Sequence, residues 1–244
     1  MAEQFFEGPN GKIAFDRVEG SEPGFVWLGG FRSDMTGGKA THLANWAEKS
    51  GRAFLRFDYS GHGKSDGVFE DGCISDWTAD AEAVIASVTS GPQILIGSSM
   101  GAWIAALLTR NAPDNTSAFV GIAPAPDFTE EIMLPGLPSG MKRSLKENGQ
   151  VPLPSIYDEA PTIVTQKLFE DGRKNLVLGS GVPFSGKVRI LQGMKDPDVP
   201  WKHAVRFADA FDSPDVRILL MKDGDHRLSR PQDLAVLEEA IARL

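Results

Sequence analysis

The chain is organised around a short apolar run that ends in a serine flanked by glycines. Residues 93–96 read Gln-Ile-Leu-Ile, the next five are Gly97-Ser98-Ser99-Met100-Gly101, and a helical pattern continues to about Asn111. A serine at such a junction of strand and helix requires a very sharp turn, and only glycine fits two residues to either side. The turn exposes the hydroxyl at a helix N-terminus, where free N–H groups favour negative charge. We therefore predict Ser99 as a nucleophile; the alternatives are Ser98 and a plain glycine-rich turn with two capping serines.

Apolar, strand-like runs alternate with helical patterns over most of the chain. The runs lie at residues 25–28, 52–57, 93–96, 118–123, 188–191 and 216–221. This alternation predicts crossover connections, and hence an α/β fold with a mostly parallel central sheet and helices on both faces. Strands of such a sheet are buried on both faces, which explains their unbroken apolar runs. Near the start of the chain, Asn10-Gly11 predicts a β-hairpin.

Two helix boundaries follow from single residues. Ser75 is the expected N-cap of the helix that carries Trp77, because a serine side chain can accept a hydrogen bond from a free backbone N–H. Gly51 is the expected end of the preceding helix, since glycine readily adopts the left-handed conformation in which many helices end.

The regular alternation breaks between about residues 124 and 180, where proline and glycine are frequent. Apolar side chains in this stretch include Met133, Leu134, Leu137, Met141, Leu145 and Ile156. We interpret the stretch as a small cap inserted into a single domain of residues 1–244. Two roles are open for its apolar side chains: they line an apolar pocket, or they pack the cap onto the sheet.

Charge and cysteine content exclude several classes of function. The net charge of −8 argues against binding to nucleic acid or to an anionic membrane surface. Cys73 is the single cysteine, which excludes a disulfide within the chain and a metal site built on cysteines. We expect no cofactor and no metal. Because no run is long enough to span a membrane and the first residues lack the pattern of a signal peptide, we expect a soluble, cytoplasmic protein.

A serine becomes a nucleophile when a base accepts its proton and a carboxylate orients that base. Of the four histidines, His226 alone lies in a tight loop directly after a late apolar strand. His42 and His203 are expected on the surface of helices, and His62 is expected to be a hydrogen-bonding residue of an earlier loop. His226 is therefore the predicted base.

The acid is expected in the loop after the penultimate strand, where both Asp196 and Asp198 stand. Asp196 is nearer to the end of the strand and is preferred. An oxyanion hole needs two donors that point at the developing negative charge. The backbone N–H groups of Met100, next to the nucleophile, and of Phe31, after the first long apolar strand, are the predicted donors.

These motifs together resemble the α/β-hydrolase superfamily. They resemble more closely its small mitochondrial members described as acyl-protein thioesterases (depalmitoylases) and acyl-glucuronide esterases, with their bacterial-type relatives. The resemblance is carried by residues 31–40, 56–67, 91–101, 193–196, 199–201 and 225–227. It implies the triad Ser99, Asp196 and His226, in agreement with the interpretation from the residues themselves. Gly29-Gly30 departs from the His-Gly pair that is common in the superfamily, but leaves the oxyanion donor in place.

The expected activity is the hydrolysis of carboxylic esters or thioesters with an apolar acyl group, through an acyl-enzyme. The partner is then a small-molecule ester or thioester, or an acylated protein, and not a nucleic acid. Two alternatives stay open. One is a carbon–carbon bond hydrolase or a peptidase that uses the same triad, and the other is a non-catalytic receptor of the same fold. An intact triad argues against the receptor.

Overall fold

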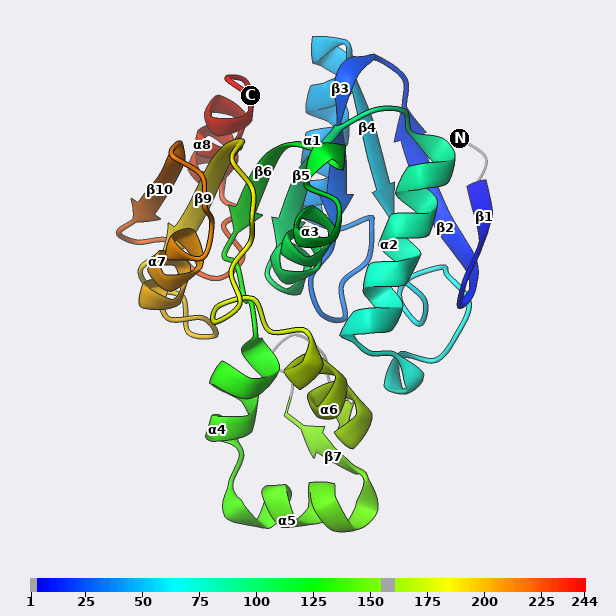
Figure 1. Cartoon of the computed structure of the whole chain (residues 1–244), viewed down its shortest axis with the longest axis vertical. Helices are drawn as coiled ribbons and strands as arrows, with labels where there is room; N and C mark the ends of the chain where they lie inside the picture. Colours follow the sequence, from blue (N-terminus) through cyan, green and yellow to red (C-terminus); the bar gives the residue numbers. More distant parts are fainter. Residues whose placement is uncertain (1–3, 155–160) are drawn as a thin grey trace.

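The computed structural model describes residues 4–154 and 161–244 and contains an eight-stranded sheet (Figure 1). The strands lie in the order β1-β2-β4-β3-β5-β6-β9-β10. Their bounds are β1 (Gln4–Gly8), β2 (Gly11–Val18), β3 (Ser21–Leu28), β4 (Arg52–Phe57), β5 (Gln93–Ser98), β6 (Thr116–Ile122), β9 (Lys187–Gly193) and β10 (Val216–Met221). The β1–β2 and β2–β4 pairs are antiparallel and the other pairs are parallel. The predicted architecture is thus confirmed, as is the hairpin, in which Gly8 faces Gly11.

Helices cover both faces of the sheet. Their bounds are α1 (Gly38–Ser50), α2 (Ile74–Val88), α3 (Met100–Asn111), α7 (Trp201–Asp209) and α8 (Pro231–Ile241), with short 3-10 turns η1 (Phe69–Asp71) and η2 (Pro113–Asn115). Figure 1 shows α2, α3 and α7 in front of the sheet, while α1 and α8 pack on its other face. Side chains of β5 alternate between the two cores: Leu95 faces α2 and α3, and Ile94 and Ile96 face α1. This central strand is buried on both faces, as predicted.

The edge strand β10 departs from the prediction of full burial. Leu219 and Leu220 are 38% and 41% exposed, whereas every residue of β5 is buried. Among the described strands, β10 pairs with β9 alone. The prediction was wrong here because an edge strand has no neighbour on one side, and an apolar composition does not distinguish an edge strand from a central one.

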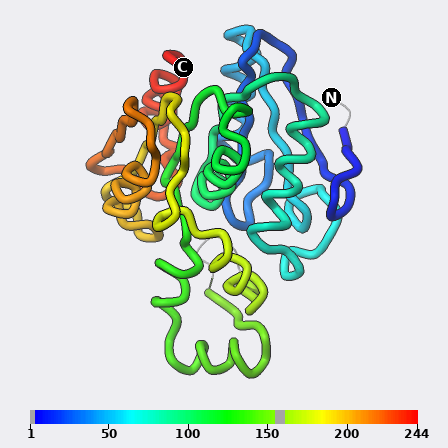
Figure 2. The backbone as a smooth tube through the Cα atoms, in the orientation of Figure 1, coloured from blue at the N-terminus to red at the C-terminus, as the bar shows by residue number. Residues whose placement is uncertain are grey.

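The segment between β6 and β9, residues 123–186, leaves the sheet and is called the insertion below. Its elements are the π-helical turn η3 (Thr129–Met133), α4 (Leu134–Gly136), α5 (Ser139–Asn148), β7 (Gln150–Leu153), β8 (Thr162–Thr165) and α6 (Gln166–Lys174), with β7 and β8 antiparallel. Figures 1 and 2 show α4, α5, β7 and α6 below the sheet, at the end where β6 finishes. Because parallel strands end at the same edge of a sheet, the insertion lies on the same side as the carboxyl end of β5.

Apolar side chains of the insertion pack inward. Leu137 and Leu145 are buried within the larger core cluster. Met133, Leu134 and Met141 are half-buried against the same cluster, and Ile156 lies outside the described residues. The two leucines are therefore part of a buried core, whereas the half-buried side chains keep part of their surface exposed.

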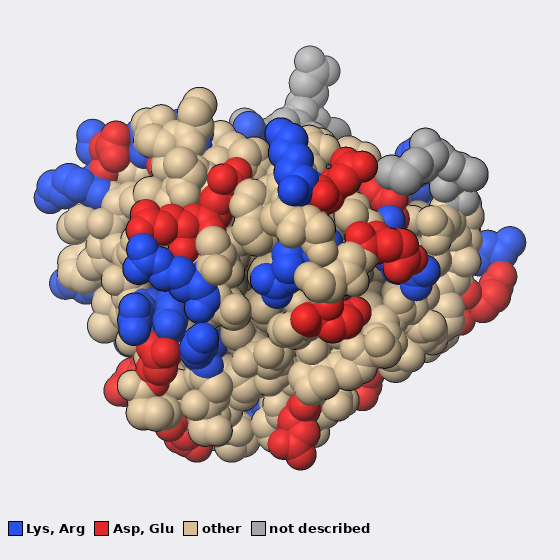
Figure 3. All heavy atoms as spheres, turned by 90° about the horizontal axis from the view of Figure 1, so that it is seen from above, with Lys and Arg blue, Asp and Glu red and all other residues tan. Residues whose placement is uncertain are grey.

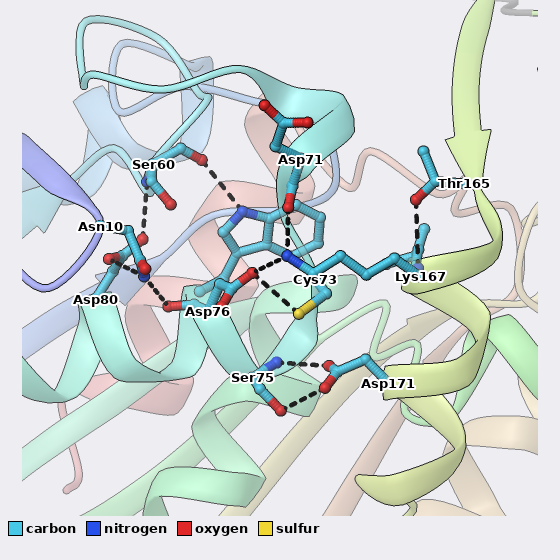
Figure 4. A network of polar contacts seen from close by, with 12 residues as sticks. Asn10, Ser60, Asp71, Cys73, Ser75, Asp76, Asp80, Thr165, Lys167 and Asp171 are labelled. Carbon is cyan, nitrogen blue, oxygen red and sulfur yellow. Dashed lines mark hydrogen bonds and ion pairs between the residues drawn. The ribbon is translucent and has the colours of Figure 1, made fainter. Parts of the chain in front are cut away.

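Polar contacts tie α6 of the insertion to the start of α2 (Figure 4). Lys167 donates to the carboxylate of Asp76 at 2.8 Å and to the backbone carbonyl of Asp71. The thiol of Cys73 donates to the same carboxylate oxygen of Asp76 at 3.1 Å. Although partial burial raises the pKa of Asp76, the hydrogen bonds from Lys167 and Cys73 hold it below its usual value.

One predicted helix boundary is right and the other is wrong. Gly51 ends α1 in the left-handed conformation, with φ of 67°. In contrast, α2 begins at Ile74 with Cys73 at the N-cap position, so Ser75 lies inside the first turn. Its N–H and hydroxyl donate to the carboxylate of Asp171 at 2.8 and 2.7 Å. The acceptor that satisfies this helix end therefore comes from α6, 96 residues away in the sequence.

The end of the molecule opposite the insertion carries charges of both signs. Figure 3 shows lysine and arginine side chains beside aspartate and glutamate there, with several basic groups gathered toward one side. Within residues 4–154 and 161–244, no helix has both the length and the apolar character needed to cross a bilayer.

Candidate active site

Ser99 stands on the sharp turn between β5 and α3. Its φ of 53° and ψ of −118° form a conformation that residues with a side chain rarely adopt. A Cβ on Gly97 would lie 2.4 Å from Ala102, and one on Gly101 would lie 2.0 Å from the carbonyl oxygen of Leu28. The turn can close only because both flanking positions are glycine, which is the reason that the sequence pattern implied.

A continuous chain of hydrogen bonds joins Ser99, His226 and Asp196. The Oγ of Ser99 lies 3.1 Å from Nε2 of His226, and Nδ1 of His226 lies 2.8 Å from Oδ2 of Asp196. Because an ionised carboxylate can only accept, Nδ1 carries the proton and Nε2 accepts from the serine hydroxyl. Ser99 follows β5 directly, Asp196 lies three residues after the end of β9, and His226 lies five residues after the end of β10. The parallel sheet thus brings together side chains that are far apart in the sequence.

The surroundings of Asp196 favour its ionised form. Its side chain is fully buried, and its Oδ1 accepts hydrogen bonds from the backbone N–H groups of Asp198 and Val199, both at 2.8 Å. Burial by itself would raise the pKa of Asp196, but the hydrogen bond and charge of His226, with the two N–H groups, hold it below its usual value. The carboxylate of Asp196 thus accepts a hydrogen bond from His226, and the backbone N–H of Asp198 donates to the same carboxylate.

Gln192, which the sequence analysis missed, supports Asp196 from inside β9. Its Nε2 donates to Oδ2 of Asp196 at 2.9 Å, and the whole residue is buried. The carbonyls of Gly193 and Val199 lie on the same side of the amide, at 3.1 and 3.3 Å, which identifies the donor end. The available signal was an amide side chain directly after the apolar pair Ile190-Leu191, because a buried amide needs partners.

His62 is a loop residue that forms a hydrogen bond, as predicted. Its Nδ1 donates to the carbonyl of Ser60 at 3.2 Å, and its ring packs against Tyr59, Phe69 and Trp77 with centroids 5.1 to 5.5 Å apart. Burial lowers the pKa of His62 to about 4. In the described part of the chain its Nε2 has no hydrogen-bond partner.

The prediction that His203 lies on the surface is wrong. His203 is buried, and its Nε2 donates to the carbonyl of Pro126 at 2.7 Å. Burial lowers the pKa of His203. His42 is half-buried rather than fully exposed, with Nε2 2.6 Å from the carboxylate of Glu238. The prediction from helical periodicity was wrong for His203 because the loop at Pro126, which follows β6 and is distant in the sequence, covers that face of α7.

The backbone donors predicted for an oxyanion hole lie next to Ser99. Met100 is the first residue of α3, so its N–H belongs to the free donors of a helix N-terminus. A Cβ on Gly30 would lie 3.5 Å from the Cβ of Ser99, which brings the loop that carries Phe31 against the nucleophile. Ser33 holds this loop by donating from its N–H and its hydroxyl to the carbonyl of Gly30, at 3.1 and 2.8 Å. The role of the two donors stays a prediction.

An aromatic wall stands beside this loop. The ring of Phe31 contacts Phe69 at 4.9 Å, Phe128 at 5.5 Å and Trp77 at 6.1 Å between centroids. Phe128 precedes η3 in the insertion, whereas the other three belong to the rest of the molecule. Trp77 and Phe128 are buried, whereas Phe31 and Phe69 are half-buried, so the aromatic surface that stays open comes from Phe31 and Phe69.

The same region holds a group of possible metal ligands. In the described ranges, Asp196, Asp198 and His226 bring donor atoms within 4.8 Å of one another. The Nδ1 of His226 and both oxygens of Asp196 are already engaged in hydrogen bonds, so the arrangement suits an acid–base pair. Two cavities of about 310 and 290 Å³ lie elsewhere and are lined by none of these three residues.

Comparison with known proteins agrees with this geometry. A family model described as serine aminopeptidase S33 (Hydrolase_4) matches residues 32–165. The mouse mitochondrial palmitoyl-protein thioesterase ABHD10 is 35% identical over 95% of this chain and 77% of its own length. The crystal structure of a putative hydrolase from Agrobacterium vitis is 42% identical with a TM-score of 0.93, covering 99% of this chain and 98% of that one. A structure of mouse ABHD10 is 33% identical with a TM-score of 0.91, covering 100% and 98%. The strand-turn-helix at Ser99, the parallel sheet and these matches show that the chain belongs to the α/β-hydrolase family and is a hydrolase.

Proposed function

We propose that the protein hydrolyses esters or thioesters with an apolar acyl group, through a triad of Ser99, His226 and Asp196. The observation that carries the proposal is the unbroken hydrogen-bond chain from the Ser99 hydroxyl through both ring nitrogens of His226 to Asp196. His226 accepts the proton of Ser99 as the oxygen attacks the acyl carbon, and then donates it to the leaving alcohol or thiol. A water molecule, deprotonated by the same Nε2, releases the acid from the acyl-enzyme.

The backbone N–H groups of Phe31 and Met100 stabilise the oxyanion of each tetrahedral intermediate in this proposal. The close approach of Gly30 to Ser99 supports this role, since the two N–H groups come from rigid backbone on either side of the nucleophile. Preorganised donors of this kind need no rearrangement as charge develops, which is why they contribute strongly to catalysis.

The apolar acyl group is proposed from the half-buried rings of Phe31 and Phe69, which pack against the buried rings of Trp77 and Phe128. The insertion, proposed as a cap within a single domain of residues 1–244, supplies Phe128 and the half-buried Met133. The names of the mammalian relatives point to acylated proteins, and a small-molecule ester or thioester fits the same chemistry. A cytoplasmic location stays a prediction from the sequence, because those relatives are named as mitochondrial.

A series of thioesters with acyl chains from two to ten carbons tests the proposal. Each methylene that the site buries contributes about 0.8 kcal/mol, so kcat/KM should rise about threefold to fourfold per carbon until the site is full. A fluorophosphonate probe should label the wild-type protein at Ser99. A specificity profile that is flat or falls between two and eight carbons would contradict the apolar acyl group. Faster cleavage of amino-acid anilides than of any ester or thioester would favour a peptidase, which the family description makes the second candidate.

A further inference from the structure

Backbone contacts join the turn that carries His226 to the turn that carries Asp196. A Cβ on Gly193, at the end of β9, would lie 2.3 Å from the carbonyl oxygen of Gly224. The backbone N–H of Lys195 donates to the same carbonyl at 2.9 Å. These contacts fix the turn on the side from which the chain enters it, between the end of β10 and His226.

On the other side of His226, the turn is held by a lysine from α1. The Nζ of Lys39 donates to the carbonyl of Arg227, the residue directly after His226. Leu228, which follows, is buried and adopts φ of 43°, and its N–H donates to the carboxylate of Asp225 at 2.9 Å. A left-handed conformation at a residue with a side chain persists only where its surroundings hold it. The contact from Lys39 is therefore one of those that determine where His226 stands.

The positive charge of Lys39 lies where both the helix and burial disfavour it. Lys39 is the second residue of α1, and the first turn of a helix carries a partial positive charge that repels a cation. Burial lowers the pKa of the half-buried Lys39 to about 8; Arg227 lowers it further, while the carboxylates of Asp225 in the turn and Asp233 in α8 raise it. A charge that is disfavoured in the folded protein does not stabilise the fold.

We propose that Lys39 is a positioning residue, which holds the turn of His226 so that Nε2 stays within reach of the Ser99 hydroxyl. This inference rests on the proposed function, since it assigns a residue that acts through His226 in the same reaction. A charged amine makes a stronger hydrogen bond to the carbonyl of Arg227 than a neutral one does. Loss of the charge or of the side chain should therefore loosen the turn and weaken the contact of 3.1 Å between Ser99 and His226.

Lys39→Met tests this role at pH 7.5 with an acetyl and an octanoyl thioester. Because both substrates use the same base, kcat should fall about tenfold for both while KM stays within about twofold. The melting temperature should not fall, since methionine removes a disfavoured charge and the carbonyl of Arg227 keeps the hydroxyl of Ser229 as a donor at 2.9 Å. Lys49→Met removes the same charge from the exposed last turn of α1. This matched control should leave kcat unchanged.

The dependence of kcat on pH separates positioning from a merely structural role. In the wild-type protein kcat should decline as the pH rises through about 8, where Lys39 loses its charge. Lys39→Arg should remove this decline, because a guanidinium keeps its proton at that pH. Lys39→Met should show a low kcat without the decline. Spontaneous hydrolysis is subtracted with Ser99→Ala as the blank.

Three outcomes would contradict the assignment. An unchanged kcat in Lys39→Met, or the same alkaline decline in Lys39→Met and the wild-type protein, would overturn it and leave the proposed function in place. A lower melting temperature in Lys39→Met, together with an unaltered decline in Lys39→Arg, would show that Lys39 only stabilises the fold. If the wild-type protein hydrolyses neither thioester, the proposed function itself is wrong, and the assignment falls with it.

Discussion

The sheet and the insertion differ in how much of each is buried. All six residues of β5 are buried, whereas α5 buries only Leu145 and β7 only Val151. Polar contacts also stabilise the insertion: the carboxylate of Asp127 accepts hydrogen bonds from the backbone N–H groups of Val177 and Leu178 at 2.9 Å each.

This difference separates two tasks. Ser99, Asp196 and His226 all lie in the turns that follow strands of the sheet, and the turn at Ser99 is fixed by close backbone contacts. The insertion adds Phe128, whose ring contacts that of Phe31. Changes at the strand ends should therefore affect every substrate alike, while changes in the insertion should affect stability or substrate choice.

The largest effect is expected for Ser99→Ala. Without the hydroxyl no acyl-enzyme can form, so kcat/KM should fall by several orders of magnitude for short and long acyl chains alike. The melting temperature should stay near that of the wild-type protein, because the elbow glycines are unchanged. Ser98→Ala is the matched control and should have a mild effect. Loss of activity in Ser98→Ala with activity retained in Ser99→Ala would show that Ser98, and not Ser99, is the nucleophile.

Asp196→Asn should have the next largest effect. The amide can no longer enforce the tautomer of His226 in which Nε2 accepts the serine proton, and kcat should fall by about three to four orders of magnitude. Steady-state kinetics with acetyl and octanoyl thioesters should show the same loss for both. Asp198→Asn keeps the backbone N–H that Asp196 uses and should cost far less; the opposite ranking would assign the acid to Asp198.

The third prediction concerns the pH dependence of stability that the buried His62 causes. The pKa of His62 is lowered to about 4, so the unfolded chain binds a proton below about pH 6.5 that the folded protein binds only near pH 4. The free energy of unfolding should therefore fall as the pH drops from about 6.5 to 4, by up to about 3 kcal/mol from this residue. His62→Phe, which keeps the aromatic packing, should flatten this slope in urea titrations. Parallel slopes for the two proteins would show that His62 is not the group responsible.

The smallest effect is expected where α6 of the insertion meets α2. Asp171→Ala removes the acceptor of the Ser75 N–H and hydroxyl and should cost about 1 kcal/mol. For a chain of this length the melting temperature should fall by roughly 2 to 4 °C, with hydrolysis of an acetyl ester retained. Glu170→Ala, at the exposed neighbouring position, is the control and should leave the melting temperature nearly unchanged. A loss of acetyl-ester hydrolysis in Asp171→Ala would contradict the separation of tasks between sheet and insertion.

The sequence by itself determined the features that depend on short stretches of chain. The alternation of apolar runs with helical patterns determined the parallel sheet, and the five residues around Ser99 determined the sharp turn, because a close backbone approach leaves room only for glycine there. The loops after the last two strands indicated Asp196 and His226, because parallel strands end at one edge of the sheet and the residues that follow them can meet.

The tertiary structure alone decided the features that depend on contacts between distant stretches. It placed β10 at an edge, buried His203 under the loop at Pro126, and supplied Asp171 to the start of α2. It also brought Gln192 onto Asp196. Periodicity reports which face of an element is apolar but not what covers that face, and a side chain 96 residues away leaves no trace in the local pattern.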